Sequence, residues 1–234
     1  RKFPNIHCVV LTPFSHGITK RMQNEDLSIF DYVFCWLGNT NLILSIIKLI
    51  EDKMNLEHDI QEAGVQMILL VEDSIRFYSS ILPNLYNYIL EQSKNFSQEA
   101  LNRHAATMRM RGRPKVVLAR TYEEAQKLYD KYSDNTLGVI SDARFPLKSA
   151  AKAFGNEVMP EEKPKHRTDT FGREKCPDAG LQLFRYIRKN DPFVPLIIES
   201  SESENRAKAE AEGFRFVDKN SKKMSVDLRR LMEE

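Results

Sequence analysis

Five short apolar segments alternate with helix-like segments between residues 67 and 234, and this alternation limits the possible folds more than any other feature. The segments are MILLV (67–71), KVVLA (115–119), LGVIS (137–141), PLIIES (195–200) and FRFVDK (214–219). Short apolar strands separated by helices are typical of a parallel sheet with helices on both faces. We therefore predict an α/β fold with a doubly wound, five-stranded parallel sheet.

The composition excludes several classes of protein. The net charge is +2 and 41% of the 234 residues are hydrophobic, as in ordinary globular domains, so direct binding to nucleic acid is not expected. No apolar run reaches the roughly 20 residues of a membrane span. Cys8, Cys35 and Cys176 lack CxxC spacing, which favours free thiols in a reducing cytoplasm over disulfides or zinc. The start at Arg1, without an initiator Met or a signal peptide, fits a piece of a longer protein.

The first apolar segment runs directly into two acids, in MILLVEDS (67–74). A charge at the edge of a core is costly unless something pairs it. Glu72 and Asp73 are therefore either solvated at the end of the strand or hold a cation.

Polar side chains also follow the other strands of the predicted sheet. Asp142, Ser200 and Lys219 each stand at or just after the end of a strand. In open α/β sheets the functional crevice lies beyond the carboxyl ends of the strands. We expect these three residues to meet Glu72 and Asp73 on one rim.

The first 60 residues follow a shorter version of the same pattern. Residues 7–14 and 30–36 are strand-like, and residues 41–63 predict a long amphipathic helix that ends at Gly64. We predict a partial α/β unit over residues 1–58, a linker at 59–66, and a complete domain over 67–234 with an insertion at about 147–177.

Four motifs in order along the chain resemble those of response-regulator receiver domains. They are VEDS with Glu72 and Asp73, GVISDARFP with Asp142 and Pro146, PLIIESS with Ser200, and FRFVDKN with Lys219. The resemblance implies the flavodoxin-like strand order 2-1-3-4-5. The helix expected at 97–110, RMRGRPK and DNTLGVISDARFP also resemble receiver modules attached to proteins similar to phosphoenolpyruvate synthase or pyruvate-phosphate dikinase.

The resemblance implies a role for each residue on the rim. Mg²⁺ would be held by Glu72, Asp73, Asp142 and the backbone carbonyl of Arg144. Asp142 would accept a phosphoryl group from a histidine kinase or a small phosphodonor, Lys219 would contact that group, and the Ser200 hydroxyl would hydrogen-bond it. The chain would then be a signalling module of the two-component type rather than an enzyme, and would switch an output domain or partner protein.

Several residues depart from the receiver pattern. Asn220 follows Lys219, where receivers usually have Pro, and a cis bond before a residue other than proline would cost roughly 3 kcal/mol. Arg144 places a bulky cation beside the metal ligands. The insertion, with Lys163, Lys165, His166, Arg167 and Arg173, either covers the pocket or is disordered.

Other functions stay open beside the phosphoacceptor. One is an inert pseudo-receiver that serves as a dimerisation or scaffold module. A metal-dependent phosphatase is disfavoured because Arg144 stands where its second acid is expected. Ser200 could act only as a helix N-cap, and Phe216 is either a switch aromatic or a core residue.

Three further patterns concern the surface and the N-terminal unit. This unit resembles a degenerate half-receiver, with Thr12 in the hydroxyl position and Trp36 in the lysine position, and is not expected to be phosphorylated. We interpret Arg109, Arg111, Arg113 and Lys115 as a solvated helix end rather than a nucleic-acid patch. The stripe Leu42, Ile43, Ile46, Ile47, Ile50 and Met54 predicts core or dimer packing. Residues 1–63 should therefore pack onto the complete domain or pair with a second copy, with Ile43, Ile46, Ile47 and Ile50 in that contact.

Overall fold

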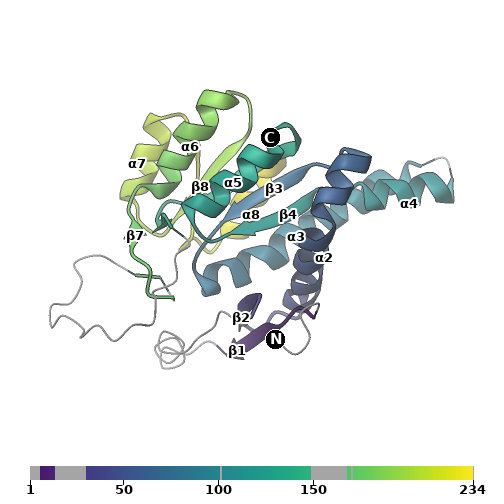
Figure 1. Cartoon of the computed structure of the whole chain (residues 1–234), viewed down its shortest axis with the longest axis horizontal. Helices are drawn as coiled ribbons and strands as arrows, with labels where there is room; N and C mark the ends of the chain where they lie inside the picture. Colours follow the sequence, from purple (N-terminus) through teal and green to yellow (C-terminus); the bar gives the residue numbers. More distant parts are fainter. Residues whose placement is uncertain (1–5, 14–29, 101, 149–167, 170, 234) are drawn as a thin grey trace.

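The computed structural model describes residues 6–13, 30–100, 102–148, 168–169 and 171–233 (Figure 1). Its main sheet has five strands, and every neighbouring pair is parallel. The strands are β3 (Met67–Val71), β4 (Lys115–Ala119), β5 (Thr136–Asp142), β8 (Leu196–Ser200) and β9 (Arg215–Asp218), in the spatial order β4-β3-β5-β8-β9. Counted along the chain this is 2-1-3-4-5, so the predicted fold class and strand order are confirmed.

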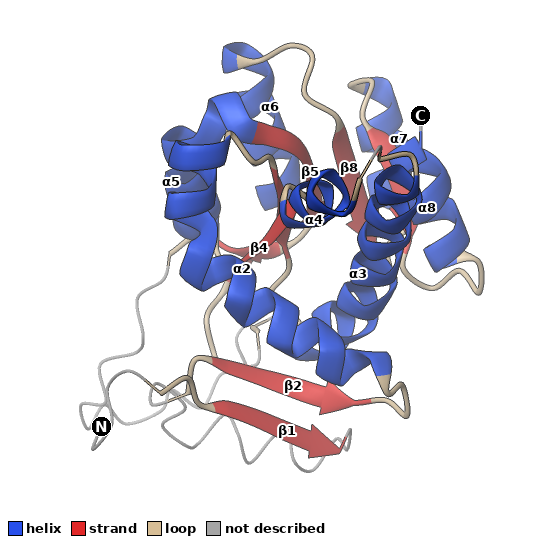
Figure 2. Ribbon diagram, turned by 90° about the vertical axis from the view of Figure 1, so that its right-hand side faces the viewer, coloured by secondary structure: helices blue, strands red, loops and turns tan. Residues whose placement is uncertain are grey.

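Helices cover both faces of the main sheet (Figure 2). On one face lie α5 (Tyr122–Tyr132), α6 (Ala179–Asn190) and α7 (Glu204–Ala211), and on the other lie α3 (Ile75–Gln98) and α8 (Met224–Glu233). Side chains alternate along each strand. In β3, Leu69 and Val71 join the first core, and Ile68 and Leu70 join the second. This two-sided burial explains why the strand is apolar at every position.

The helices after β3 differ from the expectation at one boundary. The apolar positions Phe77, Ile81, Leu85 and Ile89, spaced four residues apart, lie on α3, which continues to Gln98. The helix expected at 97–110 is α4 (Arg103–Arg111), which begins at a new N-cap where the amide of Ala105 donates to the Asn102 side chain at 2.8 Å. An Asn side chain that accepts from the amide of the third helical residue strongly favours the start of a helix at that Asn. The second helix therefore starts after Asn102, and Ser97 and Gln98 belong to α3.

The N-terminal segment packs onto the main domain. Strands β1 (Val9–Pro13) and β2 (Tyr32–Trp36) form a parallel pair beside α2 (Asn41–Ala63) (Figures 1 and 2). The buried amide of Cys35 donates to Ser79 Oγ at 2.9 Å, and the Tyr78 hydroxyl donates to the carbonyl of Val33. Side chains of β2 and α2 also share a core with β3, so the prediction that this segment packs onto the complete domain is confirmed.

The apolar stripe of α2 divides between the core and the surface. Leu42 and Ile46 are buried, whereas Ile43, Ile47 and Met54 are 44%, 56% and 64% exposed. Of the two contacts expected for Ile43 and Ile47, the one with the main domain is therefore not formed, and the one with a second copy stays a prediction. Positions one residue apart on a helix point about 100° apart, so a stripe this wide cannot all face one neighbour.

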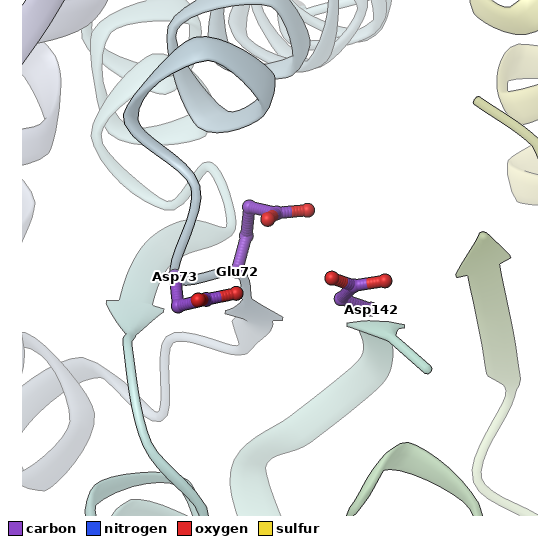
Figure 3. A group of neighbouring side chains, drawn as sticks. All are labelled: Glu72, Asp73 and Asp142. Carbon is purple, nitrogen blue, oxygen red and sulfur yellow. The ribbon is translucent and has the colours of Figure 1, made fainter. Parts of the chain in front are cut away.

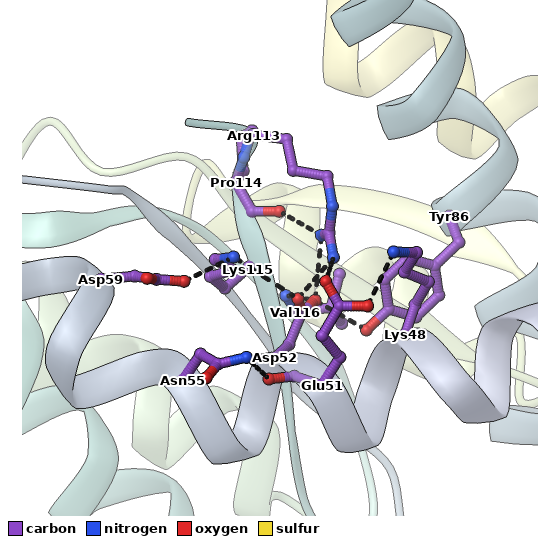
Figure 4. A network of polar contacts seen from close by, with 10 residues as sticks. All are labelled: Lys48, Glu51, Asp52, Asn55, Asp59, Tyr86, Arg113, Pro114, Lys115 and Val116. Atoms are coloured by element: carbon purple, nitrogen blue, oxygen red, sulfur yellow. Dashed lines mark hydrogen bonds and ion pairs between the residues drawn. The ribbon is translucent and has the colours of Figure 1, made fainter. Parts of the chain in front are cut away.

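The outer edge of β4 is covered by α2 through a buried ionic cluster (Figure 4). Asp52 accepts two hydrogen bonds from Arg113, at 2.6 and 3.1 Å, and one from the amide of Val116 at 2.9 Å. The Tyr86 hydroxyl donates to the same carboxylate at 2.9 Å. An edge strand otherwise presents unpaired N–H groups, and Asp52 satisfies one of them.

This cluster corrects the interpretation of the basic run. Arg113 and Lys115 are only 4% and 5% exposed, so they are not part of a solvated helix end. Lys115 pairs with Asp59 at 2.7 Å, and Arg113 pairs with Asp52. The run of positive charges does not reveal that α2, far away in sequence, brings carboxylates to it.

Several smaller features complete the architecture. A 3-10 turn (Ser133–Asn135) precedes β5, and β6 (Phe145–Pro146) pairs antiparallel with β7 (Lys175–Cys176) just beyond the end of β5. The three cysteines are free thiols. Within the described ranges, no helix is both long and apolar enough to cross a membrane. Lys163, Lys165, His166 and Arg167 of the insertion lie outside the described residues.

Candidate metal centre

Three carboxylates meet at the carboxyl edge of the sheet, between the neighbouring strands β3 and β5 (Figure 3). Glu72, Asp73 and Asp142 each offer an oxygen, and these oxygens lie within 4.8 Å of one another. Glu72 and Asp73 are completely buried, so they are not solvated strand-end acids. Adjacent residues of an extended chain point to opposite sides, and the two acids therefore approach Asp142 from different directions.

Lys219 lies among these acids, directly after β9. Its ammonium contacts Glu72 Oε2 and is 3.0 Å from Asp142 Oδ1. It also lies 4.5 Å from the centre of the Phe77 ring, a favourable position for a cation. The structure therefore brings the predicted lysine together with two of the three predicted acids.

Burial and mutual repulsion change the proton affinity of the acids. Burial, together with the Asp142 and Asp73 charges, raises the pKa of Glu72 to about 8 despite Lys219. Burial and Asp142 raise the pKa of Asp73 to about 6 despite Lys175. Burial disfavours the ammonium of Lys219, but Asp142, Glu72 and Glu199 raise its pKa above the ordinary value. Burial is the largest cause of the raised pKa values of both acids, and repulsion between neighbouring carboxylates adds to it.

A fourth carboxylate, Glu199 on β8, was not singled out from the sequence. It is fully buried, and within the described part of the chain neither of its side-chain oxygens has a hydrogen-bond partner. Burial and, to a lesser extent, Asp142 raise its pKa to about 7, against the effect of Lys219. An acid inside the otherwise apolar segment LIIES was the signal that could have identified it.

A second lysine, Lys175 on β7, was also missed. Its ammonium lies 2.7 Å from Asp73 Oδ2, and its side chain is 16% exposed. It comes from the end of the insertion, which has no periodic pattern that would have placed it. The described end of the insertion therefore contacts the site.

Ser200 and Arg144 line the same cavity of about 350 Å³, together with Asp142, Lys175 and Lys219. Ser200 Oγ accepts from the amide of Glu202 at 3.1 Å and from Asn205 Nδ2 at 2.8 Å, so it makes a cap-like contact. Its own hydroxyl proton is not used in these bonds. The side chain of Arg144 pairs with Glu202 at 2.9 Å.

Asp142 is positioned by its own strand and by α6. Its Oδ1 accepts from the amide of Ala143 at 2.8 Å, and the amide of Gly180 donates to the carbonyl of Ala143 at 3.1 Å. A Cβ atom at Gly180 would lie 2.3 Å from the backbone oxygen of Asp142. Only glycine allows α6 to approach this closely.

The donor set fits a small, hard divalent cation. Carboxylate oxygens are the protein ligands that Mg²⁺ prefers, and it commonly keeps water or phosphate oxygens as its other ligands. Glu72, Asp73 and Asp142 offer such oxygens beside a cavity.

The residue after Lys219, Asn220, donates from its side chain to the carbonyl of Ser201 at 2.9 Å, and every described peptide bond is trans.

Comparisons with known proteins give only distant likenesses. No protein-family model and no curated protein sequence matches the chain. Among solved structures, a response-regulator receiver domain protein from Clostridium thermocellum is 18% identical, with a TM-score of 0.39 over 72% of this chain and 92% of that one. The non-phosphorylated HemR receiver domain from Leptospira biflexa is 18% identical, with a TM-score of 0.37 over 72% and 95%.

A plant receiver domain gives a similar result. The receiver domain of the histidine kinase CKI1 from Arabidopsis thaliana, in complex with Mg²⁺ and BeF3⁻, is 15% identical, with a TM-score of 0.34 over 76% and 96%. The fold assignment rests on the sheet order and the helix layers described above.

Proposed function

We propose that this chain is a phosphoacceptor signalling module of the two-component type, in which Asp142 is phosphorylated in the presence of Mg²⁺. The observation that carries the proposal is the meeting of Glu72, Asp73 and Asp142 with Lys219 beside one cavity. Such a module takes its phosphoryl group from a histidine kinase or a small phosphodonor and passes a conformational signal to an output domain or partner.

Glu72, Asp73, Asp142 and the carbonyl of Arg144 would hold the metal ion. When bound, Mg²⁺ neutralises the charge that develops on the transferring phosphoryl group. Asp142 provides the attacking oxygen. The new bond joins this oxygen to phosphorus. At the same time the bond from phosphorus to the donor breaks, which is a bond to imidazole nitrogen in a phosphohistidine or to oxygen in acetyl phosphate, and the donor leaves with the electron pair.

The remaining residues act on the phosphoryl group. The Lys219 ammonium, 3.0 Å from Asp142 Oδ1, contributes a fixed positive charge beside the acceptor. The free proton of the Ser200 hydroxyl can be donated to a phosphoryl oxygen. Arg144 pairs with Glu202, which directs its guanidinium to that carboxylate.

A second candidate is the inert pseudo-receiver, which would serve as a scaffold or dimerisation module. The ion pair of Lys175 with Asp73 favours it, because a cation already occupies one of the metal-binding carboxylates. The N-terminal unit, as a degenerate half-receiver, fits a scaffold role as well.

The test is incubation with Mg²⁺ and acetyl phosphate, followed by intact mass measurement. We expect a mass gain of one phosphoryl group in the wild-type protein, none in Asp142→Asn, and the wild-type gain in Asp227→Asn, whose acid lies partly exposed on α8. The absence of a gain at saturating donor and metal would favour the inert module.

A further inference from the structure

Lys175 makes the least expected contact of the site. Its ammonium lies 2.7 Å from Oδ2 of Asp73, a carboxylate that is completely buried. Lys175 is not on the main sheet. It is carried by β7, which pairs with β6 immediately beyond Asp142.

The segment that carries Lys175 is anchored by a compact turn. The buried carboxylate of Asp169 accepts from the amides of Phe171 at 3.0 Å and Arg173 at 2.7 Å, and from Arg173 Nε at 2.7 Å. Thr168 and Glu174 pair across the same turn. The described backbone on both sides of Lys175 is therefore hydrogen-bonded, and it places the Lys175 side chain against Asp73.

The contact has a consequence for metal binding. Asp73 is one of the three acids whose oxygens lie within 4.8 Å of one another. Its Oδ1 accepts no hydrogen bond from any described residue, and its Oδ2 contacts Lys175. A metal ion that uses this carboxylate meets an ammonium in a poorly solvated place, where like charges repel strongly.

We propose that Lys175 is a built-in counter-ion that holds Asp73 in the metal-free protein and that Mg²⁺ must displace from this carboxylate. The inference rests on the proposed function, because it concerns the same metal centre. The Lys175–Asp73 pair lowers the Mg²⁺ affinity of the protein. The free energy gained when the ion binds Asp73 must exceed the free energy lost when the ion pair breaks. The end of the insertion and the metal centre are therefore coupled.

The test is calorimetric titration of the full chain with MgCl2, without any phosphodonor. Lys175→Met removes the ammonium and should tighten Mg²⁺ binding on the order of tenfold, within the usual range for competing interactions. Lys175→Arg keeps the charge and should bind Mg²⁺ no more tightly than the wild type. Lys127→Met, an exposed lysine on α5, changes the net charge equally and should leave the affinity unchanged.

Each outcome of the titration either supports or overturns the role of Lys175. Equal or weaker Mg²⁺ binding by Lys175→Met would overturn the inference, and so would tightening of the same size in Lys127→Met. If Lys175→Met does not fold, as judged by circular dichroism, Lys175→Gln keeps a hydrogen-bond donor without the charge and must show the tightening instead. Failure of the proposed function looks different: Mg²⁺ would bind, but Asp142 would gain no phosphoryl group. Absence of Mg²⁺ binding in all variants would overturn both.

Discussion

Two clusters of charged side chains in the described part of the chain, each built around buried carboxylates, differ in their balance of charge. The edge cluster, between α2 and β4, joins Glu51, Asp52 and Asp59 to Lys48, Arg113 and Lys115. The cavity cluster, at the carboxyl edge of the sheet, joins Glu72, Asp73, Asp142 and Glu199 to Lys175 and Lys219. The edge cluster has three acids and three cations, whereas the cavity cluster has four acids and two cations.

This difference in charge balance is the one that we expect between a structural cluster and a cation-binding site. In the edge cluster every charge has a partner, and the Asp52 carboxylate is fully used by hydrogen bonds. With all groups ionised, the cavity cluster lacks two positive charges, which is the charge of one divalent cation. Buried carboxylates in excess over their cations either bind a cation or take up protons. Burial raises the pKa values of Glu72 and Glu199, which favours proton uptake in the metal-free protein.

The largest expected effect is the removal of the central acid of the edge cluster. Asp52→Ala leaves the buried Arg113 with only the partly exposed Glu51, at 3.8 Å, and should lower the free energy of unfolding by about 3–5 kcal/mol. Glu57→Ala, an exposed acid on the same helix, should change it by less than about 0.5 kcal/mol. Urea unfolding measures both, and a loss below about 1 kcal/mol in Asp52→Ala would show that the cluster is not structural.

The second-largest expected effect is the loss of the close contact between α6 and Asp142 of the cavity cluster. Gly180→Ala forces α6 away from Asp142 and should cost about 1–3 kcal/mol, because the new Cβ meets backbone at 2.3 Å. Gly112→Ala places its Cβ at 3.4 Å from the nearest atom and is the matched control. Thermal unfolding of the two variants compares them. Equal stability would contradict the role given to Gly180.

The cavity cluster should also make stability depend on pH. The pKa values of Glu72, Glu199 and Asp73 are raised to about 8, 7 and 6, so the folded chain binds protons that the unfolded chain releases. The free energy of unfolding should therefore fall as the pH rises from about 5 to about 8 without metal, by at least the roughly 1.4 kcal/mol of one pKa unit. Urea unfolding across this range measures the fall.

Two changes should reduce this dependence on pH. Saturating Mg²⁺ competes with the protons and should stabilise the protein more at pH 8 than at pH 5. Glu199→Gln removes one of the titrating groups and should flatten the profile. If the dependence of stability on pH stays unchanged in Glu199→Gln, Glu199 does not contribute to it.

The smallest expected effect lies at the rim of the edge cluster. The Glu51 side chain is 41% exposed and pairs with Lys48 at 2.7 Å, so solvent screens much of the interaction. Glu51→Ala should cost less than about 1 kcal/mol by urea unfolding. A cost as large as that of Asp52→Ala would mean that the whole cluster acts as one unit.

The sequence predicted the sheet and those site residues that follow a strand. Strand ends of a parallel sheet share one edge, and this rule alone brings Glu72, Asp73, Asp142, Ser200 and Lys219 together. Lys175 could not be predicted in this way, because it follows a segment without periodicity. The pairing of Asp52 with Arg113 was hidden too, because an acid on an amphipathic helix and a basic run each look solvated when considered alone.

The division of the chain at residues 59–66 stays a prediction. The long helix ends at Ala63 as expected, and Gly64 has a φ of +59° at its C-cap. The side chains of α2 belong to both cores of the main domain, so the helix and the domain share their interior. Association with a second copy through the exposed Ile43 and Ile47 also stays a prediction, which light scattering can check.

The most direct test of the charge difference between the two clusters is the stoichiometry of Mg²⁺ binding to the wild-type chain, measured by calorimetry at pH 8. We expect one ion per chain in the wild type and in Glu57→Ala, and loss of this ion in Asp142→Asn. Absence of binding at millimolar Mg²⁺, or one bound ion that persists in Asp142→Asn, would contradict the assignment of the cavity cluster as a divalent-cation site.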